Sequence, residues 1–449
     1  MRFLPDRQTL RVAVVGFGYI GSCVGLTLAD LGHDVLAIDS DQALLAELAS
    51  GKFRFSEPGM AQLWARLAGS GRLQVTADYA DVADADVVII TVGEPVAGSR
   101  SSLSDRLNDV GRRLAGVLRA GQLVLLKSTV SPGATRRLRP LLESGGLAEG
   151  TDFALAYCPE RLAEGAALQQ LRSLPVVIGG CGPASAAAAA EFWSRTLGVP
   201  TVTVATPEVA EMIKLASNYW IDANVAIANE LAQACAAFGV NVLEVIEGAN
   251  TLPKGSGHVN ILLPSVGVGG ACLPRDPWIL WRSAQEAGVR MPVVEAARAA
   301  NDAMPQYACD LIGSELARLG KSLAGAVVGV LGLAFKSNTG DLRMTPVKPA
   351  VEGLLTAGAI VRVFDPLADE AEVKAVFGLT PSADIDGAVE QADCIAVLAG
   401  HRQFEDIDYA ALAGRVAAPC LILDGRMYYP AETVASLRRL GFAFRGIGW

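Results

Sequence analysis

The chain has 449 residues, more than one compact core accommodates, so we expect two or three domains. Its 51% hydrophobic and 19% charged residues are typical of a packed globular protein and exclude a disordered one. A net charge of −9 argues against nonspecific binding to nucleic acid, so any phosphate that the protein binds must be held by local donors.

The first predicted elements are a strand, a glycine turn, a helix and a second strand. The strand is the β-branched run Val12 to Val15, the turn carries Gly16, Gly18 and Gly21, and the second strand ends in Asp39. These glycines would admit a pyrophosphate to the helix N-terminus, and the acid is placed to bond a ribose 2′-hydroxyl. Together they form the fingerprint of a dinucleotide-binding unit. Because a carboxylate repels a 2′-phosphate, we expect NAD rather than NADP as the cofactor.

Further apolar runs alternate with helical stretches up to about residue 200. They are ADVVIITVG, QLVLLKSTV, FALAYCPE and LPVVIGG, and this alternation predicts a parallel, doubly wound sheet. Thr129 and Glu160 follow two of these strands, so we expect them at the carboxyl edge of the sheet beside the nicotinamide. There they could hold a water molecule. For Glu160 and Glu164 the alternative is plain solvation at the surface.

A long helix is predicted next, with Thr206 as N-cap, Pro207 in its first turn and Gly239 at its end. It would hold about 32 residues and extend about 50 Å. A helix of this length outgrows one domain, so we interpret it as a connector and the spine of a dimer.

Lys214 and Asn218 are four residues apart on this helix and therefore share a face. Their neighbours are largely apolar, which favours a buried ammonium over the solvated lysine that is usual on a surface helix. A buried ammonium beside an amide can stabilise a developing oxyanion or transfer a proton. Both residues are candidate catalytic residues.

The stretch GVGGACLPRDP places Cys272 directly after a glycine turn and before a predicted helix. A thiol at a helix N-terminus has its thiolate favoured by the helix dipole, which raises its reactivity. The alternative is a buried structural thiol, which we expect for the other cysteines. Asp276, four residues on, could accept a proton or position Lys214.

A second α/β pattern begins near residue 321 with AGAVVGVLGLAF and continues through AIVRVFDP, ADCIAVLAG and CLILDGR. Open α/β sheets bind ligands at the carboxyl ends of their strands. We therefore expect a second nucleotide-like ligand on this domain, opposite the NAD fingerprint.

NAD, a nucleophilic cysteine and a water-holding acid suggest one sequence of steps. Hydride leaves an alcohol to give an aldehyde, the thiolate adds to the aldehyde, and a second hydride leaves to give a thioester. Water then releases a carboxylic acid. A dehydrogenase that stops at the carbonyl needs no cysteine, so the four-electron oxidation explains Cys272.

The cysteine pattern and the N-terminal sequence indicate the cellular compartment. The eight cysteines form no CxxC pair, which is typical of free thiols in a reducing environment. The N-terminus lacks a signal-peptide layout and no window offers about 20 uninterrupted apolar residues, so we expect a cytoplasmic protein that does not span a membrane. The chain has only three histidines, too few for the metal ligands of most zinc hydrolases, so we expect no metal.

Over nearly its whole length the chain resembles the UDP-glucose/GDP-mannose dehydrogenase family, the nucleotide-sugar 6-dehydrogenases. The matching segments are VVGFGYIG, KSTVSPG, PERLAEGAAL, KLASNYW, NVAIANE, GVGGACLPRDP, GLAFKSNTGDLRMTP, VFDP and LDGR. The resemblance implies a four-electron oxidation of a sugar C6 alcohol to a uronic acid with two NAD. It also implies a homodimer built on the long helix.

The fold that the resemblance implies is α/β in three parts. An N-terminal Rossmann domain binds NAD (1–200), and an all-α dimerisation region contains the long central helix and carries the catalytic lysine and cysteine (201–315). A C-terminal Rossmann-like α/β domain binds the UDP-sugar (316–449).

Matched residue by residue, the resemblance makes Cys272 the nucleophile, Lys214 and Asn218 the support of the oxyanion, and Asp276 the associated acid. Thr129 and Glu160 fall on positions of water handling and thioester hydrolysis. The cofactor positions are Gly16, Gly18, Tyr19, Ile20, Gly21, Asp39, Thr129, Glu164 and Arg343, the last reaching the pyrophosphate from the C-terminal domain. The substrate positions are Glu160, Leu162, Lys214, Asn218, His258, Val268, Gly269, Phe335, Lys336 and Arg426.

Three positions depart from the family pattern, and one of them is Leu44, which stands where a basic residue often follows the ribose-binding acid by five residues. His258 stands where many relatives offer an arginine across the dimer to the substrate, and Glu94 stands where a small hydroxyl residue is common.

The substrate branch is indicated by CLPRDPWIL and YCPER, which look like members that act on UDP-N-acetylhexosamines. We expect UDP-N-acetylglucosamine or UDP-N-acetylmannosamine, with UDP-glucose as the alternative. A two-electron hydroxyacid dehydrogenase of the 6-phosphogluconate type shares the Rossmann domain, the long helix and the Lys–Asn spacing. It would lack the glycine–cysteine loop and the third domain. An NAD-binding regulatory protein with a decayed site is disfavoured because no expected catalytic side chain is missing.

Overall fold

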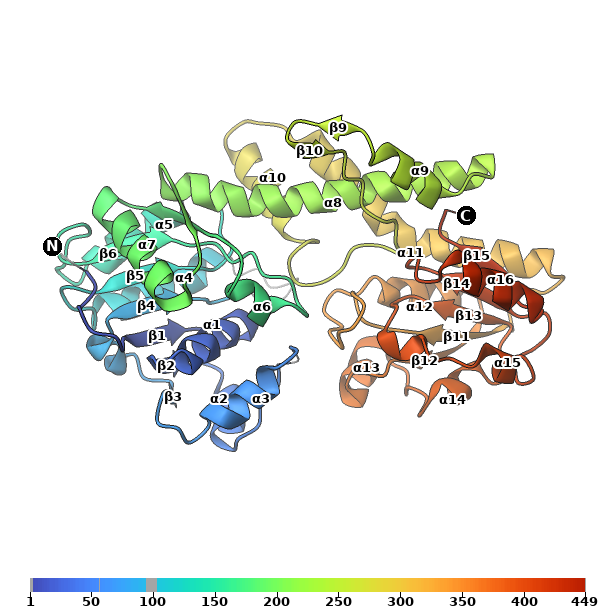
Figure 1. Ribbon diagram of the computed structural model, residues 1–449, viewed down its shortest axis with the longest axis horizontal. Coiled ribbons are helices and arrows are strands. Elements are labelled where there is room, and N and C mark those ends of the chain that lie inside the picture. The colour runs from blue at the N-terminus through green and yellow to red at the C-terminus, as the bar shows by residue number, and fades with distance from the viewer. Residues whose placement is uncertain (1–2, 56, 94–102, 449) are drawn as a thin grey trace. The chain divides into compact units, whose positions relative to one another are not determined.

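The computed structural model describes residues 3–55, 57–93 and 103–448, and it separates into two compact units between Ala216 and Ser217 (Figure 1). Helix α8 (Pro207–Phe238) runs through this division. Its 32 residues match the predicted long helix. The hydroxyl of Thr206 accepts the N–H of Val209 at 3.4 Å, and Gly239 ends the helix with a φ of 67°.

The first unit is built on an eight-stranded sheet in the order β3-β2-β1-β4-β5-β6-β7-β8 across its described residues. The strands are β1 (Arg11–Val15), β2 (Asp34–Ile38), β3 (Leu73–Thr76), β4 (Val87–Ile90), β5 (Leu123–Leu126), β6 (Ala154–Tyr157), β7 (Val176–Gly180) and β8 (Thr201–Val204). The helices are α1 (Tyr19–Asp30), α2 (Gln42–Ala49), α3 (Met60–Leu67), α4 (Leu103–Ala115), α5 (Ala134–Glu143), α6 (Ala167–Leu171) and α7 (Pro183–Leu197), with a 3₁₀ turn at Ala80–Asp84.

Both faces of this sheet are covered by helices. Val12 and Val14 of β1 point into a core shared with α1, α3 and α7. Ala13 and Val15 point into a second core with α4 and α5. Successive side chains of a strand alternate between faces, so a strand that is apolar throughout is buried on both sides.

The prediction of a sheet that is parallel throughout is wrong at β7. This strand runs antiparallel to β6, with Ala156 opposite Gly180, while β8 returns parallel to β7. A parallel neighbour needs a crossover that returns the chain to the other edge of the sheet, usually a helix. The segment between β6 and β7 contains only the five-residue helix α6 and turns back at the carboxyl edge.

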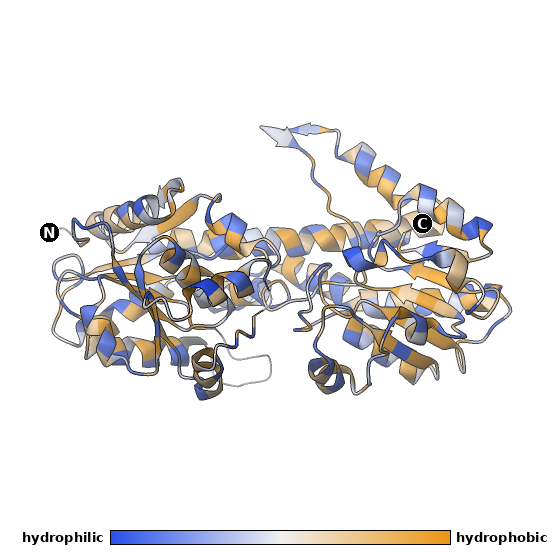
Figure 2. Ribbon diagram, turned by 60° about the horizontal axis from the view of Figure 1, so that its bottom comes forward, coloured by the Kyte–Doolittle hydropathy of each residue, from blue (hydrophilic) through white to orange (hydrophobic). Residues whose placement is uncertain are grey.

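The second unit contains a parallel five-stranded sheet in the order β12-β11-β13-β14-β15, whose strands are strongly apolar (Figure 2). The strands are β11 (Val327–Leu331), β12 (Ile360–Phe364), β13 (Cys394–Val397), β14 (Leu421–Asp424) and β15 (Ala443–Gly446), and a separate hairpin pairs β9 (Pro253–Lys254) with β10 (Gly257–His258). The helices are α9 (Val242–Ala249), α10 (Asp276–Glu286), α11 (Pro292–Arg318), α12 (Val347–Thr356), α13 (Glu370–Phe377), α14 (Ile385–Val389), α15 (Tyr409–Leu412) and α16 (Ala431–Arg439), with a 3₁₀ turn at Arg402–Phe404.

The predicted fold class is confirmed: an N-terminal Rossmann sheet, a central helical region and a C-terminal parallel α/β sheet. The exact boundaries at residues 200 and 315 stay a prediction. In the part of the chain that the structure describes, no helix combines the length and apolarity needed to cross a bilayer.

Candidate active site

The glycine turn between β1 and α1 is tight on one side and open on the other. Gly16 has a φ of 93°, and a Cβ on Gly21 would lie 2.0 Å from the Gly16 carbonyl oxygen. Thr91 donates its hydroxyl to the same oxygen at 2.6 Å. A Cβ on Gly18 would meet no atom within 4 Å. The open side therefore has room for a ligand against the backbone.

Helix α1 begins directly after Gly18, with Tyr19 and Ile20 half-buried in its first turn. Gly18 supplies no side-chain cap, and the first turn contains no acidic residue. The N–H groups at such a helix N-terminus favour an anion. This turn fits the pyrophosphate of a dinucleotide.

Asp39 follows β2 and lies beside the glycine turn. Its carboxylate accepts the N–H of Phe17 at 2.7 Å and that of Asp41 at 2.9 Å. These two bonds fix its orientation and leave lone pairs for the hydroxyls of a ribose. The geometry fits the cofactor position predicted for Asp39.

Two predicted residues of the first unit form a buried ion pair. Lys214 of α8 donates its Nζ to Glu160 Oε2 at 3.3 Å, and both side chains are less than a tenth exposed. Glu160 also accepts the N–H of Leu162. Thr129 is half-buried after β5, at the same carboxyl edge of the sheet as Glu160 after β6. A lysine held in this way is desolvated, and its ammonium is fixed beside a carboxylate at the edge of the sheet.

Sequence reasoning missed Glu57, a buried carboxylate that ties α1 to the loop carrying Leu162 and Glu164. It accepts the hydroxyl of Tyr19 and the N–H groups of Gly165 and Ala167, the latter two both at 2.7 Å. Burial, and then the bond to Glu57, raise the pKa of Tyr19. No local sequence pattern identifies a glutamate whose hydrogen-bond partners lie this far away in sequence.

Lys127 is a second missed residue, buried after β5 with its Nζ donating to the Pro159 carbonyl at 3.5 Å. Burial lowers the pKa of Lys127, although Glu160 opposes this effect. An ammonium of lowered pKa next to Glu160 belongs to the same polar cluster.

Cys272 differs from the other cysteines, all of which the structure describes. It is exposed, whereas Cys181 is half-buried and the remaining six are buried. It lies in the turn before α10, where its carbonyl accepts the N–H groups of Arg275 and Asp276 at 3.0 and 2.8 Å. Burial raises the pKa of Cys158 to about 11 and that of Cys181 to about 12, so those thiols stay protonated at neutral pH. Reactive cysteines need access and a polar surrounding, and Cys272 has access.

Asn218 and Asp276 meet in the second unit. Asn218 Nδ2 donates to Asp276 Oδ2 at 2.6 Å, and both residues are buried. Arg275, which sequence reasoning missed, forks onto the other carboxylate oxygen at 3.0 and 3.2 Å. Asp276 is thus held in place directly after the turn that carries Cys272.

A pocket of about 260 Å³ opens beside that turn, entirely within the second unit. It is lined by Val268, Gly269 and Leu273 together with Phe335, Lys336 and Arg426, five of which were predicted as substrate contacts. A Cβ on Gly269 would lie 2.6 Å from the Met344 carbonyl, so only glycine allows this close approach.

Arg426 is fixed in the pocket wall by two carbonyl acceptors. Its Nε donates to Leu398 O at 2.8 Å and its guanidinium to Phe335 O at 2.7 Å. Burial lowers the pKa of Arg426 to about 10, so it remains charged at neutral pH. A fixed guanidinium beside an aromatic ring and a lysine suits a phosphorylated nucleoside.

Arg343, predicted to contact the cofactor, and His258, predicted to contact the substrate, do not line this pocket. Arg343 is exposed and pairs with Asp341, Nε to Oδ2 at 2.8 Å. His258 is exposed on the β9–β10 hairpin. Glu94 falls outside the residues that the structure describes.

Comparison with known proteins identifies relatives along nearly the whole chain. Three domains of the UDP-glucose/GDP-mannose dehydrogenase family match it: the NAD binding domain over residues 10–197, the central domain over 208–303 and the UDP binding domain over 329–431. The UDP-N-acetyl-D-mannosamine dehydrogenase of Pyrococcus horikoshii is 34% identical over 440 residues, covering 98% of this chain and 99% of the relative.

Two solved structures agree in fold over nearly all of both chains. UDP-D-ManNAc dehydrogenase from Pyrococcus horikoshii superposes with a TM-score of 0.86 at 33% identity, covering 98% of this chain and 99% of that one. A UDP-glucose dehydrogenase from Pyrobaculum islandicum gives a TM-score of 0.84 at 30% identity, covering 99% of each chain.

Proposed function

The chain belongs to the UDP-glucose/GDP-mannose dehydrogenase family and is an NAD-dependent nucleotide-sugar dehydrogenase, and on that premise we propose that it oxidises the C6 alcohol of a UDP-N-acetylhexosamine, first of all UDP-N-acetylmannosamine, to a uronic acid. The observation that carries the proposal is the place of Cys272. It is exposed between Gly269 and Leu273, both of which line the pocket. The similarity to a UDP-N-acetyl-D-mannosamine dehydrogenase supports the choice of sugar.

The proposed reaction converts R–CH₂OH, two NAD⁺ and water into R–COO⁻, two NADH and three protons. The turn at Gly16, Gly18 and Gly21, with Asp39, fits NAD, which when bound would accept one hydride in each oxidation. Cys272 adds as a thiolate to the aldehyde carbon, and the resulting thiohemiacetal is oxidised to a thioester.

The polar residues then have separate tasks. Lys214 and Asn218 stabilise the oxyanions that form on the sugar oxygen. Glu160, held by Lys214, acts together with Thr129 to orient the water that attacks the thioester carbon. The thiolate of Cys272 then leaves. Asp276 keeps the Asn218 amide oriented.

We expect two NADH per nucleotide sugar consumed, measured by absorbance against a chromatographic count of substrate and product. A panel of UDP-N-acetylmannosamine, UDP-N-acetylglucosamine, UDP-glucose and GDP-mannose identifies the sugar by kcat/KM. The similarity to a UDP-glucose dehydrogenase makes UDP-glucose the second candidate, and its turning over fastest in the panel would replace our first choice. One NADH per sugar with aldehyde accumulating would contradict the thiol mechanism.

The two-electron hydroxyacid dehydrogenase is disfavoured by the same features. Residues 329–431 match a UDP binding domain, which a hydroxyacid dehydrogenase does not need. A reaction that stops at the carbonyl also has no step for an exposed cysteine such as Cys272.

We also propose a homodimer through α8. Trp220 and Ile227 are each 49% exposed and are seven residues apart, so they lie on one face of the helix. Phe238 at its end is 83% exposed. Exposed apolar side chains aligned on one helix face are typical of an interface, and a second copy of the chain is the simplest occupant.

Trp220→Lys is therefore expected to convert the dimer into a monomer, because it places a charge in the apolar interface. Light scattering coupled to size exclusion measures the mass. Ile360→Lys is the matched control, since Ile360 is 53% exposed on β12 in the second sheet. A wild-type chain that is monomeric at micromolar concentration would refute the proposal.

We place the enzyme in the cytoplasm because its eight cysteines are scattered along the sequence and form no CxxC pair, a pattern typical of a reducing compartment. Recovery of the activity in a secreted or periplasmic fraction would refute this.

A further inference from the structure

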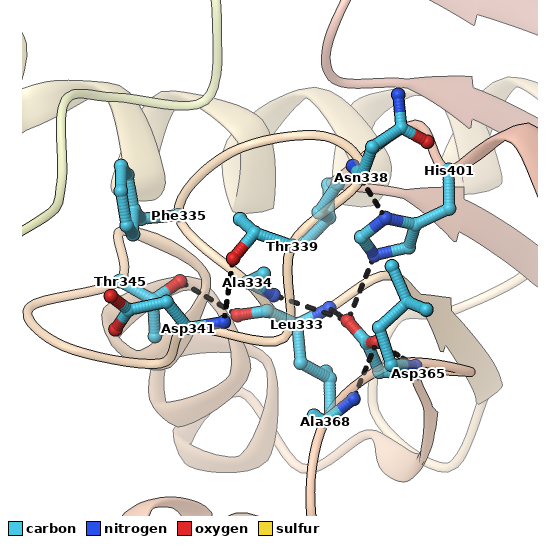
Figure 3. A network of polar contacts seen from close by, with 12 residues as sticks. Leu333, Ala334, Phe335, Asn338, Thr339, Asp341, Thr345, Asp365, Ala368 and His401 are labelled. Atoms are coloured by element: carbon cyan, nitrogen blue, oxygen red, sulfur yellow. Dashed lines mark hydrogen bonds and ion pairs between the residues drawn. The ribbon is translucent and has the colours of Figure 1, made fainter. Parts of the chain in front are cut away.

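His401 and Asp365 form a buried pair at the carboxyl edge of the second sheet (Figure 3). Asp365 directly follows β12, and His401 follows β13 by four residues. Neither residue lines the pocket, and the reaction described above uses neither. Their side chains are fully buried, which is unusual for ionisable groups unless they are paired and hydrogen-bonded to neighbouring groups.

The contacts of His401 fix its tautomer. Nδ1 accepts the backbone N–H of Asn338 at 2.9 Å, so this nitrogen carries no proton. Nε2 lies 3.0 Å from Asp365 Oδ2 and therefore donates its N–H to the carboxylate. The same carboxylate oxygen accepts the N–H of Leu333 at 2.7 Å.

Asp365 is suited to this role as a fixed acceptor. Its other oxygen accepts the N–H groups of Leu367 and Ala368 at 2.9 and 3.1 Å. Burial works against the charged form, but the bonds from His401 and from the backbone outweigh it and lower the pKa of Asp365. The carboxylate stays ionised and orients the imidazole.

The pair holds the segment 333–338 at both ends. Leu333 is bound by Asp365 and Asn338 by His401, and the side chain of Asn338 accepts the N–H of Arg402 at 2.9 Å in return. Asn338 has a φ of 60°, a left-handed conformation that a non-glycine residue keeps only when its surroundings enforce it.

Phe335 and Lys336 lie between these two anchors, and both line the pocket. A Cβ on Gly269 or Gly270 would come within 2.7 Å of Phe335, so the glycine loop packs directly on this residue. A shift of the segment would therefore move the wall of the pocket.

We propose that His401 is a positioning residue for the nucleotide of the substrate: through its neutral imidazole it fixes the segment 333–338 and with it the pocket wall formed by Phe335 and Lys336. The inference rests on the proposed function, because it takes this pocket to bind the UDP moiety. It predicts that His401 controls affinity for the nucleotide sugar and leaves affinity for NAD unchanged.

Two conservative variants separate the bonds of His401. In His401→Asn the amide oxygen can replace Nδ1 and keep the bond from Asn338, while the bond to Asp365 is lost. In His401→Gln the amide can reach toward Asp365, while the bond from Asn338 is lost. We expect His401→Gln to raise KM for the nucleotide sugar and Kd for UDP about tenfold, because the lost hydrogen bond is the one that holds Asn338 and with it the segment 333–338. His401→Asn should raise both by about threefold or less, and kcat and KM for NAD should stay within about twofold in both variants.

The matched control is His33→Gln. His33 is also buried, and its Nδ1 accepts the Leu10 N–H at 3.2 Å, but it lies directly before β2 in the other unit. It should leave Kd for UDP unchanged. Asn338→Ala is a second probe of the same segment, because Asn338 is exposed and its loss spares the buried pair. It should weaken UDP binding about threefold even if a His401 variant fails to fold.

Calorimetry with UDP, steady-state kinetics and a thermal midpoint decide the outcome. Equal effects of His401→Gln and His401→Asn, a parallel rise in KM for NAD, or an unchanged Kd for UDP in both His401→Gln and Asn338→Ala would overturn the inference. A wild-type protein that neither binds UDP nor oxidises any nucleotide sugar would instead overturn the proposed function.

Discussion

Cys272→Ala is expected to abolish formation of the carboxylic acid, lowering its rate by at least about 10³-fold, because no thioester can form without the thiol. The first oxidation needs no cysteine, so the variant should yield at most one NADH per sugar. The aldehyde that it releases should be trapped by hydroxylamine. Because Cys272 is exposed, the thermal midpoint should change little.

The assay is a chromatographic measurement of the uronic acid alongside NADH. Cys181→Ala is the control, because Cys181 is half-buried and burial raises its pKa to about 12. It should retain the wild-type stoichiometry. Acid formed at the wild-type rate by Cys272→Ala would remove Cys272 from the mechanism.

The elements that the sequence predicted well have local physical causes. The strand, glycine turn and helix at residues 11–30 follow from a β-branched run and from glycines that the turn geometry requires. Helix α8 follows from a threonine cap, a proline in the first turn, and 32 residues that end at a glycine of positive φ. Each signal lies within a few residues of the structure that it specifies.

The direction of β7 had no such local signal. The run PVVIGG predicts a buried strand, but its orientation is set by the connection from β6 and not by its own residues. Eighteen residues separate Tyr157 from Val176, enough for either a crossover or a return. Sequence spacing alone does not decide between them.

The residues of the candidate site also divide into those that a local motif marks and those that it does not. Cys272 was found because glycines and a helix start surround it in sequence. Glu57 was missed because its partners Tyr19 and Gly165 lie 38 and 108 residues away. The Asp365–His401 pair, separated by 36 residues, was missed for the same reason. Partners of buried charges depend on tertiary packing, which no short motif encodes.

Lys214→Met is expected to lower kcat by about 10²–10⁴-fold, because the ammonium that stabilises the oxyanion is removed while the volume of the side chain is kept. The same change should destabilise the protein by about 3–5 kcal/mol, since Glu160 is left as a buried carboxylate without its partner. Denaturant unfolding and steady-state kinetics measure the two effects separately.

A double variant then separates the effect of Lys214 on stability from its effect on activity. Glu160→Gln removes the charge but keeps an oxygen that can accept the Leu162 N–H, so Lys214→Met with Glu160→Gln should recover most of the lost stability. Activity should stay at least as low as in Lys214→Met, because the oxyanion still has no ammonium and the carboxylate that orients the water is also gone. If activity returned together with stability, Lys214 would serve only to neutralise Glu160, and the oxyanion would have to be held by Asn218 and the backbone.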